Sequence, residues 1–185
     1  MNVTLLIEGD SELTRGFNAL FRAHIDELRK RRVTLKIVLC GDKGRTKKLC
    51  DRHRQEYQQD LYLSLIDSDG PPPKVMNDDE FFMVQEMESW FLADPKLLEN
   101  YFGRGFDAKA ISGRPIEDIP NPVGVLQRAV KNTKKGPYLK VKHGVDLLAL
   151  LKFTIVRQAD NRDRLLQRLE KLNPLPQQLL PDDAG

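Results

Sequence analysis

The chain of 185 residues contains only two cysteines, Cys40 and Cys50, and a single tryptophan. Two cysteines are too few for the disulfide framework of a small secreted protein, and their spacing with His53 matches no zinc-binding pattern. The sequence has no run of about 18 apolar residues, the length that a membrane-spanning helix needs. It also starts without the basic and apolar regions of a signal peptide. We therefore expect a soluble cytoplasmic protein with no membrane partner.

An excess of charge of one sign is also lacking, because 30 Lys and Arg residues face 27 Asp and Glu residues. The charges are nevertheless unevenly distributed. From Arg29 to Arg54 there are eleven basic residues and two acids, whereas Glu56 to Glu99 holds eleven acids and two lysines. This asymmetry is typical of a basic surface for a phosphate polymer beside an acidic pocket, and equally of two solvated faces.

The first half of the sequence predicts an α/β fold. An amphipathic helical pattern from Leu13 to Leu28 and a polar, basic helical segment at 43–58 alternate with hydrophobic runs. Those runs predict strands at 3–7, 33–39 and 61–66. Strands that alternate with helices over so short a distance are typical of a mainly parallel sheet flanked by helices.

The second half predicts mostly helices. Residues 81–92 form either a strand that leads into a helix or one continuous helix, and residues 103–122 lack periodicity and are expected to be a loop. Further helices are expected at 96–101, 123–131, 145–151 and 160–172. We expect a single domain over 1–173, with an α/β core at 1–95, a helical completion at 96–173 and a loose tail at 174–185.

Two acidic clusters follow predicted strands and are the strongest functional signal. Glu8 to Glu12 follows the first strand, and Asp67-Ser68-Asp69-Gly70 follows the third. The carboxyl ends of parallel strands meet at one edge of a sheet, where α/β proteins build their sites. Carboxylates converging there suit Mg²⁺ or Mn²⁺ and phosphoryl transfer. The same residue types also suit a turn and a helix cap.

Basic residues that follow other predicted elements are candidates for binding phosphate. Lys43 and Arg45 come after the second strand, and Lys140, Lys142 and His143 come after a basic turn at 131–137. Lysine and arginine bind phosphate oxygens, so these residues suit a nucleic-acid backbone, with Lys140 the best candidate for a lysine in the site. The alternatives are a solvated loop and, for His143, a helix cap in place of proton transfer.

Two longer patterns resemble known families. A strand followed by Glu8-Gly9, with a later Asp67-x-Asp69, looks like the Toprim domain of topoisomerases, primases and nucleases of the overcoming-lysogenization-defect type. The segment from Met83 to Asp94 contains Gln85-Glu86-Met87-Glu88-Ser89-Trp90-Phe91-Leu92-Ala93-Asp94. Together with Tyr138-Leu139-Lys140-Val141-Lys142-His143-Gly144 and the following Leu147-Leu148, it resembles the small bacterial DUF4276 family, whose members look like stand-alone Toprim proteins.

The resemblance implies a Toprim-like, Rossmann-like fold and a Mg²⁺-dependent phosphoryl-transfer enzyme. Its implied site has Glu8 as acid, base or metal ligand, Asp67 and Asp69 as metal ligands, and Glu88 as a further ligand. Glu12 and Lys140 are additional catalytic candidates. We expect a nuclease on DNA or RNA, of the kind suspected in defence systems beside an ATPase. The alternatives are a non-catalytic subunit that works with an ATPase or a nucleic acid, and a nucleotide-processing enzyme.

Overall fold

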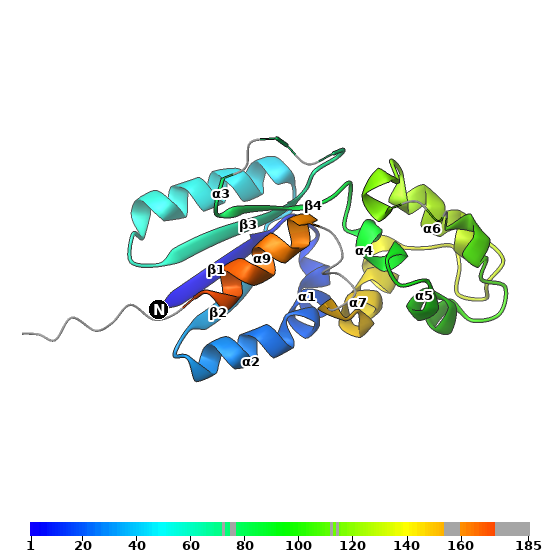
Figure 1. Ribbon diagram of the computed structural model, residues 1–185, viewed down its shortest axis with the longest axis horizontal. Coiled ribbons are helices and arrows are strands. Elements are labelled where there is room, and N and C mark those ends of the chain that lie inside the picture. The colour runs from blue at the N-terminus through cyan, green and yellow to red at the C-terminus, as the bar shows by residue number, and fades with distance from the viewer. Residues whose placement is uncertain (72, 75–76, 112, 114, 154–159, 173–185) are drawn as a thin grey trace, which may run out of the picture.

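A computed structural model of the chain describes residues 1–71, 73–74, 77–111, 113, 115–153 and 160–172 (Figure 1). The expected tail at 174–185 lies outside these residues. The elements in chain order are β1 (Asn2–Ile7), η1 (Ser11–Leu13), α1 (Thr14–Leu20), α2 (Arg22–Lys30), β2 (Thr34–Leu39), α3 (Lys43–Glu56), β3 (Leu61–Asp67), β4 (Glu80–Met83), α4 (Glu88–Leu92), α5 (Pro95–Phe102), η2 (Ala108–Ala110), η3 (Ile116–Asp118), α6 (Pro122–Val130), α7 (Lys140–Leu150) and α9 (Asp160–Glu170).

The four strands form an all-parallel sheet in the order β2-β1-β3-β4. Ile7 at the end of β1 pairs with Leu39 of β2 and with Leu65 of β3. Asp67, the last residue of β3, pairs with Met83, the last residue of β4. The strands therefore end almost level, and the residues that follow them share one edge of the sheet.

Helices cover both faces of the sheet, because successive strand side chains point to opposite sides. Val3, Leu5 and Ile7 join a large buried cluster with Phe17 of α1 and with side chains from α2, α7 and α9. Leu6, on the other face, joins a small cluster with Cys50 of α3 and Tyr62 of β3. In Figure 1, α3 lies alone on its side of the sheet, and α2 and α9 lie on the opposite side.

The strand order reverses direction at β1. The chain passes from β1 to β2 through α1 and α2 on one face, and then from β2 to β3 through α3 on the other face. Because β2 and β3 lie on opposite sides of β1, the connections diverge between the carboxyl ends of β1 and β3. Such a switch point leaves a crevice where open α/β sheets bind ligands.

A pair of glycines links the segments that follow β1 and β2. Gly9 and Gly41 follow β1 and β2 and exchange two backbone hydrogen bonds, with N to O distances of 2.7 and 3.0 Å. Both have positive φ angles, 144° and 88°, which glycine adopts without steric cost. The bridge ties the segment after β1 to the start of α3.

Helices α4 to α7 gather beyond the carboxyl end of the sheet (Figure 1). Helix α7 packs on α1 at Gly16, where an added Cβ would lie 2.9 Å from the carbonyl oxygen of Val145. Only glycine permits so close an approach of the two backbones. The contact brings Lys140, the first residue of α7, to the same end of the sheet as Glu8.

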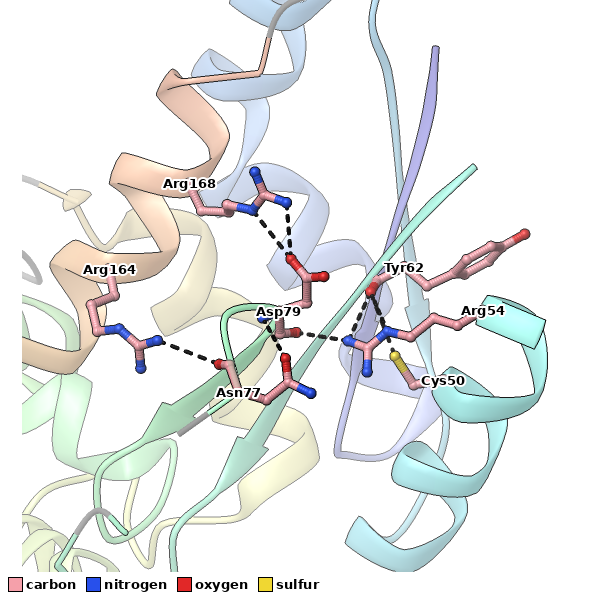
Figure 2. A network of polar contacts seen from close by, with 7 residues as sticks. All are labelled: Cys50, Arg54, Tyr62, Asn77, Asp79, Arg164 and Arg168. Atoms are coloured by element: carbon pink, nitrogen blue, oxygen red, sulfur yellow. Dashed lines mark hydrogen bonds and ion pairs between the residues drawn. The ribbon is translucent and has the colours of Figure 1, made fainter. Parts of the chain in front are cut away.

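A polar network fastens α3 and α9 to the sheet (Figure 2). The guanidinium of Arg54 donates two hydrogen bonds to the carbonyl of Tyr62, at 2.9 and 3.1 Å, and one to the carbonyl of Asp79 at 3.2 Å. Arg168 of α9 reaches the carboxylate of the same Asp79 at 3.1 Å. Both helices are thereby joined to the segment that precedes β4.

The sequence expectations agree with this architecture apart from several boundaries. The chain is α/β with a four-stranded all-parallel sheet, and residues 80–92 form a strand and then a separate helix. The helix expected from Leu13 to Leu28 is divided at Phe21. Helix α7 starts at Lys140 and not at 145, because His143 supplies an acceptor for the N–H of Leu139 at its start. The loop at 103–122 contains the short turns η2 and η3.

No helix among the described residues has both the length and the apolar character to cross a membrane.

Candidate active site at the carboxyl end of the sheet

Glu8 and Asp67 meet at the switch point between β1 and β3. The side-chain Oε2 of Glu8 accepts the backbone N–H of Asp67 at 3.0 Å, and the backbone N–H of Glu8 donates to the carbonyl of Leu65 at 2.9 Å. Partial burial raises the pKa of Glu8, opposed by the bond from Asp67 and by the charge of Lys43. The carboxylate of Glu8 therefore contacts the backbone of Asp67, and the two acids lie at neighbouring strand ends.

Asp67 is the most perturbed carboxyl group of the site. It is 8% exposed, and its Oδ1 accepts the backbone N–H of Met87, just before α4, at 2.9 Å. Burial raises its pKa to about 8; Glu8 and Glu88 add to the rise, and Lys140 opposes it. A carboxyl group that titrates near neutral pH at the edge of a sheet is typical of functional sites, although Asp67 also has a structural contact.

Glu88 is fully buried and has two partners from a distant part of the chain. Its Oε1 accepts the hydroxyl of Tyr138 at 3.0 Å, and its Oε2 accepts the ammonium group of Lys140 at 3.4 Å. The Tyr138 pKa is raised, first by burial and then by the charge of Glu88. The two donors thus supply hydrogen bonds that the buried carboxylate cannot obtain from water.

Lys140 stands between the buried carboxylates and solvent. Its side chain is 43% exposed, so the ammonium group can still reach a ligand. Burial alone would lower its pKa, but the charges of Glu88 and Asp67 reverse the direction and raise it. Lys140 is therefore a fixed cation beside the acidic pair.

Asp69 and Lys43 form the outer part of the site. Asp69 lies just after β3 with a φ of 56°, and its Oδ2 accepts the ammonium group of Lys43 at 2.6 Å. The carboxylate of Asp69 is 65% exposed and the side chain of Lys43 is 31% exposed. Lys43, at the first turn of α3, thus links the end of β3 to the helix that follows β2.

The acids do not form a ready three-ligand cage. Within the described ranges, no three His, Cys, Asp or Glu side chains are arranged to hold a metal ion. Nevertheless, Asp67 feels the charges of Glu8, Glu86 and Glu88, and Glu8 feels that of Asp69. Five carboxyl groups and two lysines, Lys43 and Lys140, therefore share this edge, so negative charge predominates there.

The remaining predicted site residues are exposed or have other contacts. Glu12 is exposed in η1, and Arg45 and Lys142 are exposed on α3 and α7. His143 is 2% exposed, and its Nδ1 accepts the N–H of Leu139 at 3.0 Å, the capping contact considered from the sequence. Burial lowers its pKa, so it is neutral at pH 7.

Two residues of this region were not expected from the sequence. Tyr138 holds Glu88, and Glu86, whose pKa burial raises with help from the charge of Glu88, adds a further acid. Tyr138 belongs to the Tyr138-Leu139-Lys140 pattern that carries part of the family resemblance, and this was the available signal. The hydrogen bond of Tyr138 to Glu88 joins residues fifty positions apart, and no local sequence pattern indicates it.

A family model described as a domain of unknown function (DUF4276) matches residues 7–170. The match includes Glu8, both aspartates after β3, Glu88 and Lys140, and thus every charged group of the site described above. Comparison with curated proteins and with solved structures found no match.

Proposed function

We propose that this chain, which belongs to the DUF4276 family, is a Toprim-like, Mg²⁺-dependent phosphoryl-transfer enzyme that acts as a nuclease on DNA or RNA. One observation carries the proposal: the carboxylate of Glu8 accepts the backbone N–H of Asp67 at the switch point of a parallel sheet, beside a lysine that a buried glutamate holds. An acid pair with an adjacent fixed cation suits the transfer of a phosphoryl group, in which protons move and negative charge develops.

The acidic edge fits a hard divalent cation. Mg²⁺ is usually held by one or two protein carboxylates and keeps several waters, so a three-carboxylate cage is not required. Oδ1 of Asp67 is bonded to Met87, which leaves its Oδ2 for the cation, and Asp69 is the second candidate ligand. A bound Mg²⁺ would polarise the phosphate and would favour the ionised form of Asp67, whose pKa is raised by burial and by the charges of Glu8 and Glu88.

The protein's own groups would then have separate roles in hydrolysis of a phosphodiester. Glu8, with its raised pKa, accepts the proton of the attacking water as the new P–O bond forms. The bond from phosphorus to the leaving sugar oxygen breaks, that oxygen takes up a proton from solvent water, and Glu8 afterwards releases its proton to solvent. The ammonium group of Lys140 stabilises the charge on the phosphate oxygens, and Glu88 and Tyr138 hold it in place.

The test is a cleavage assay on single-stranded DNA, double-stranded DNA and RNA, with Mg²⁺ or Mn²⁺ and with EDTA. Glu8→Gln and Asp67→Asn preserve side-chain size, and each is expected to lower turnover at least about a hundredfold. Glu12→Gln is the matched control, because Glu12 is an exposed acid only four residues from Glu8. Full activity in Glu8→Gln, or no metal-dependent turnover by the wild type on any substrate, would refute the proposal.

A second candidate function is a non-catalytic subunit of the same fold. It is favoured by the pairs Lys43–Asp69 and Lys140–Glu88, which neutralise two of the acids with the protein's own cations. Such a subunit would bind a nucleic acid or a partner ATPase without turnover. It predicts no heat of Mg²⁺ binding by calorimetry and unchanged nucleic-acid binding in Glu8→Gln, whereas the enzyme predicts a heat that Asp67→Asn removes.

A further inference from the structure

Helix α3 presents two chemically different sides. Its inner side is anchored: Thr46 and Cys50 are buried, and Arg54 is bonded to the carbonyls of Tyr62 and Asp79 (Figure 2). The outer side carries Arg45, Lys48 and Arg52, all exposed. These three residues are three and four positions apart, the spacing of one helical stripe.

The outer stripe lines a hollow of about 580 Å³. Its lining comprises Asp42, Gly44, Arg45, Lys48, Leu49 and Arg52. Asp42, its single acid, is engaged as the cap of α3, with Oδ1 accepting the N–H of Arg45 at 2.9 Å. The hollow therefore has a surplus of positive charge.

The cations of this stripe are less neutralised than their neighbours. Lys47 on the adjacent stripe pairs with Glu80 at 2.7 Å, whereas Arg52 lies 4.0 Å from Glu56. Over the part of the chain that the structure describes, neither Arg45 nor Lys48 has a carboxylate within ion-pair distance. A ligand with several negative charges would supply the missing partners.

The geometry points to a nucleic-acid backbone as that ligand, and we propose that the Arg45–Lys48–Arg52 stripe binds consecutive phosphates of one strand. From Arg45 to Arg52 the helix advances about 10 Å, a distance that spans several backbone phosphates. The lining of the hollow has no aromatic side chain for bases to stack on, so its cations contact phosphates, which carry no sequence information, and binding is independent of sequence. An acidic protein partner would need the aromatic and apolar anchors that interfaces use.

The stripe leads to the acidic site. Lys43, two residues before Arg45, is bonded to Asp69 at the end of β3. A strand that follows α3 toward its first turn would therefore bring a phosphodiester to Glu8 and Asp67. This inference rests on the proposed function for what happens to the phosphodiester, but the binding itself requires neither metal nor catalysis.

The test is fluorescence anisotropy in EDTA with a labelled 20-nucleotide single-stranded DNA, the same sequence as RNA, and a duplex, at 50 to 200 mM salt. Three phosphate contacts predict that log K falls with log salt with a slope of about −2 for a single strand and about −2.7 for a duplex. The triple variant Arg45→Gln, Lys48→Gln, Arg52→Gln should bind at least about tenfold more weakly, with a slope near zero. The three arms identify which nucleic acid binds most tightly.

The matched control removes three exposed cations from other helices: Arg15→Gln, Arg22→Gln and Lys96→Gln. It should bind as the wild type does, and Arg45→Lys with Arg52→Lys should retain most of the affinity. The inference is overturned if the wild type binds none of the three nucleic acids, if the stripe variant binds unchanged, or if both triple variants lose affinity equally. EDTA prevents cleavage, so the binding assay does not depend on turnover. Nucleic-acid binding without metal-dependent turnover would refute only the proposed function. Turnover together with unchanged binding by the stripe variant would refute only this inference.

Discussion

The hydroxyl of Tyr138 donates a hydrogen bond of 3.0 Å to the carboxylate of Glu88, and that carboxylate has no solvent exposure. The contact joins the segment before α7 to the first turn of α4. Lys140 donates to the second oxygen of Glu88, so the carboxylate that Tyr138 holds in turn fixes the position of this lysine. Residues far from each other in sequence thus determine where one ammonium group lies.

Removing the tyrosine hydroxyl should destabilise the protein. Tyr138→Phe leaves Oε1 of Glu88 buried without its donor, and we expect a loss of about 1 to 3 kcal/mol in the free energy of unfolding, measured with urea. Adding Glu88→Gln to Tyr138→Phe should cost less than the sum of the two single changes, because both act on one contact. Strict additivity would contradict the coupling.

The titration of Asp67 should make stability depend on pH. Its folded pKa of about 8 exceeds the ordinary value near 4, so the folded protein binds more protons between these limits. The free energy of unfolding therefore falls as pH rises from about 5 to 8, by up to about 1.4 kcal/mol per pH unit. Glu8, Glu86, Glu88 and Lys140 face this group, and their charges contribute to its pKa. Urea unfolding in EDTA across this range should show the slope, and Asp67→Asn should flatten it; an equal slope in the variant would be evidence against this pKa.

Arg54 should be irreplaceable by another cation. Its planar guanidinium donates to two different carbonyls, a geometry that an ammonium group does not reproduce. We expect Arg54→Lys to lower the free energy of unfolding by about 1 to 2 kcal/mol. Arg52 is an exposed arginine on the same helix, so Arg52→Lys should change the free energy of unfolding by less than about 0.5 kcal/mol. Equal effects of the two changes would show that the network in Figure 2 contributes little.

A methyl group at Gly16 should separate α1 from α7. The added Cβ of Gly16→Ala would meet the Val145 carbonyl and the side chain of Leu148 at 2.9 and 3.0 Å. Overpacking of this kind costs about 1 to 3 kcal/mol, which thermal unfolding would detect. Ala19→Gly, an exposed position on the same helix, is the comparison. If Gly16→Ala is as stable as the wild type, α1 and α7 can move apart freely, and their contact does not fix the position of Lys140.

The sequence predicted the parallel sheet because each of its first three strands is a mostly apolar run that ends at polar residues. It therefore predicted that Glu8 and Asp67 would share an edge. It did not predict that Asp69 pairs with Lys43, since this depends on the positive φ after β3 and on the exact start of α3. Nor did it reveal Tyr138 as a partner of Glu88, because pairing across fifty residues follows from tertiary packing and not from periodicity.

The bridge between Gly9 and Gly41 has a consequence for how the edge of the sheet meets a ligand. Glu8 lies between a backbone bond to Leu65 and the paired bonds of Gly9, so its main chain is held on both sides. The conformational entropy of this residue is lost when the protein folds and not when a ligand arrives. Such preorganisation lets even a modest number of contacts give useful affinity, because association need not also order the backbone.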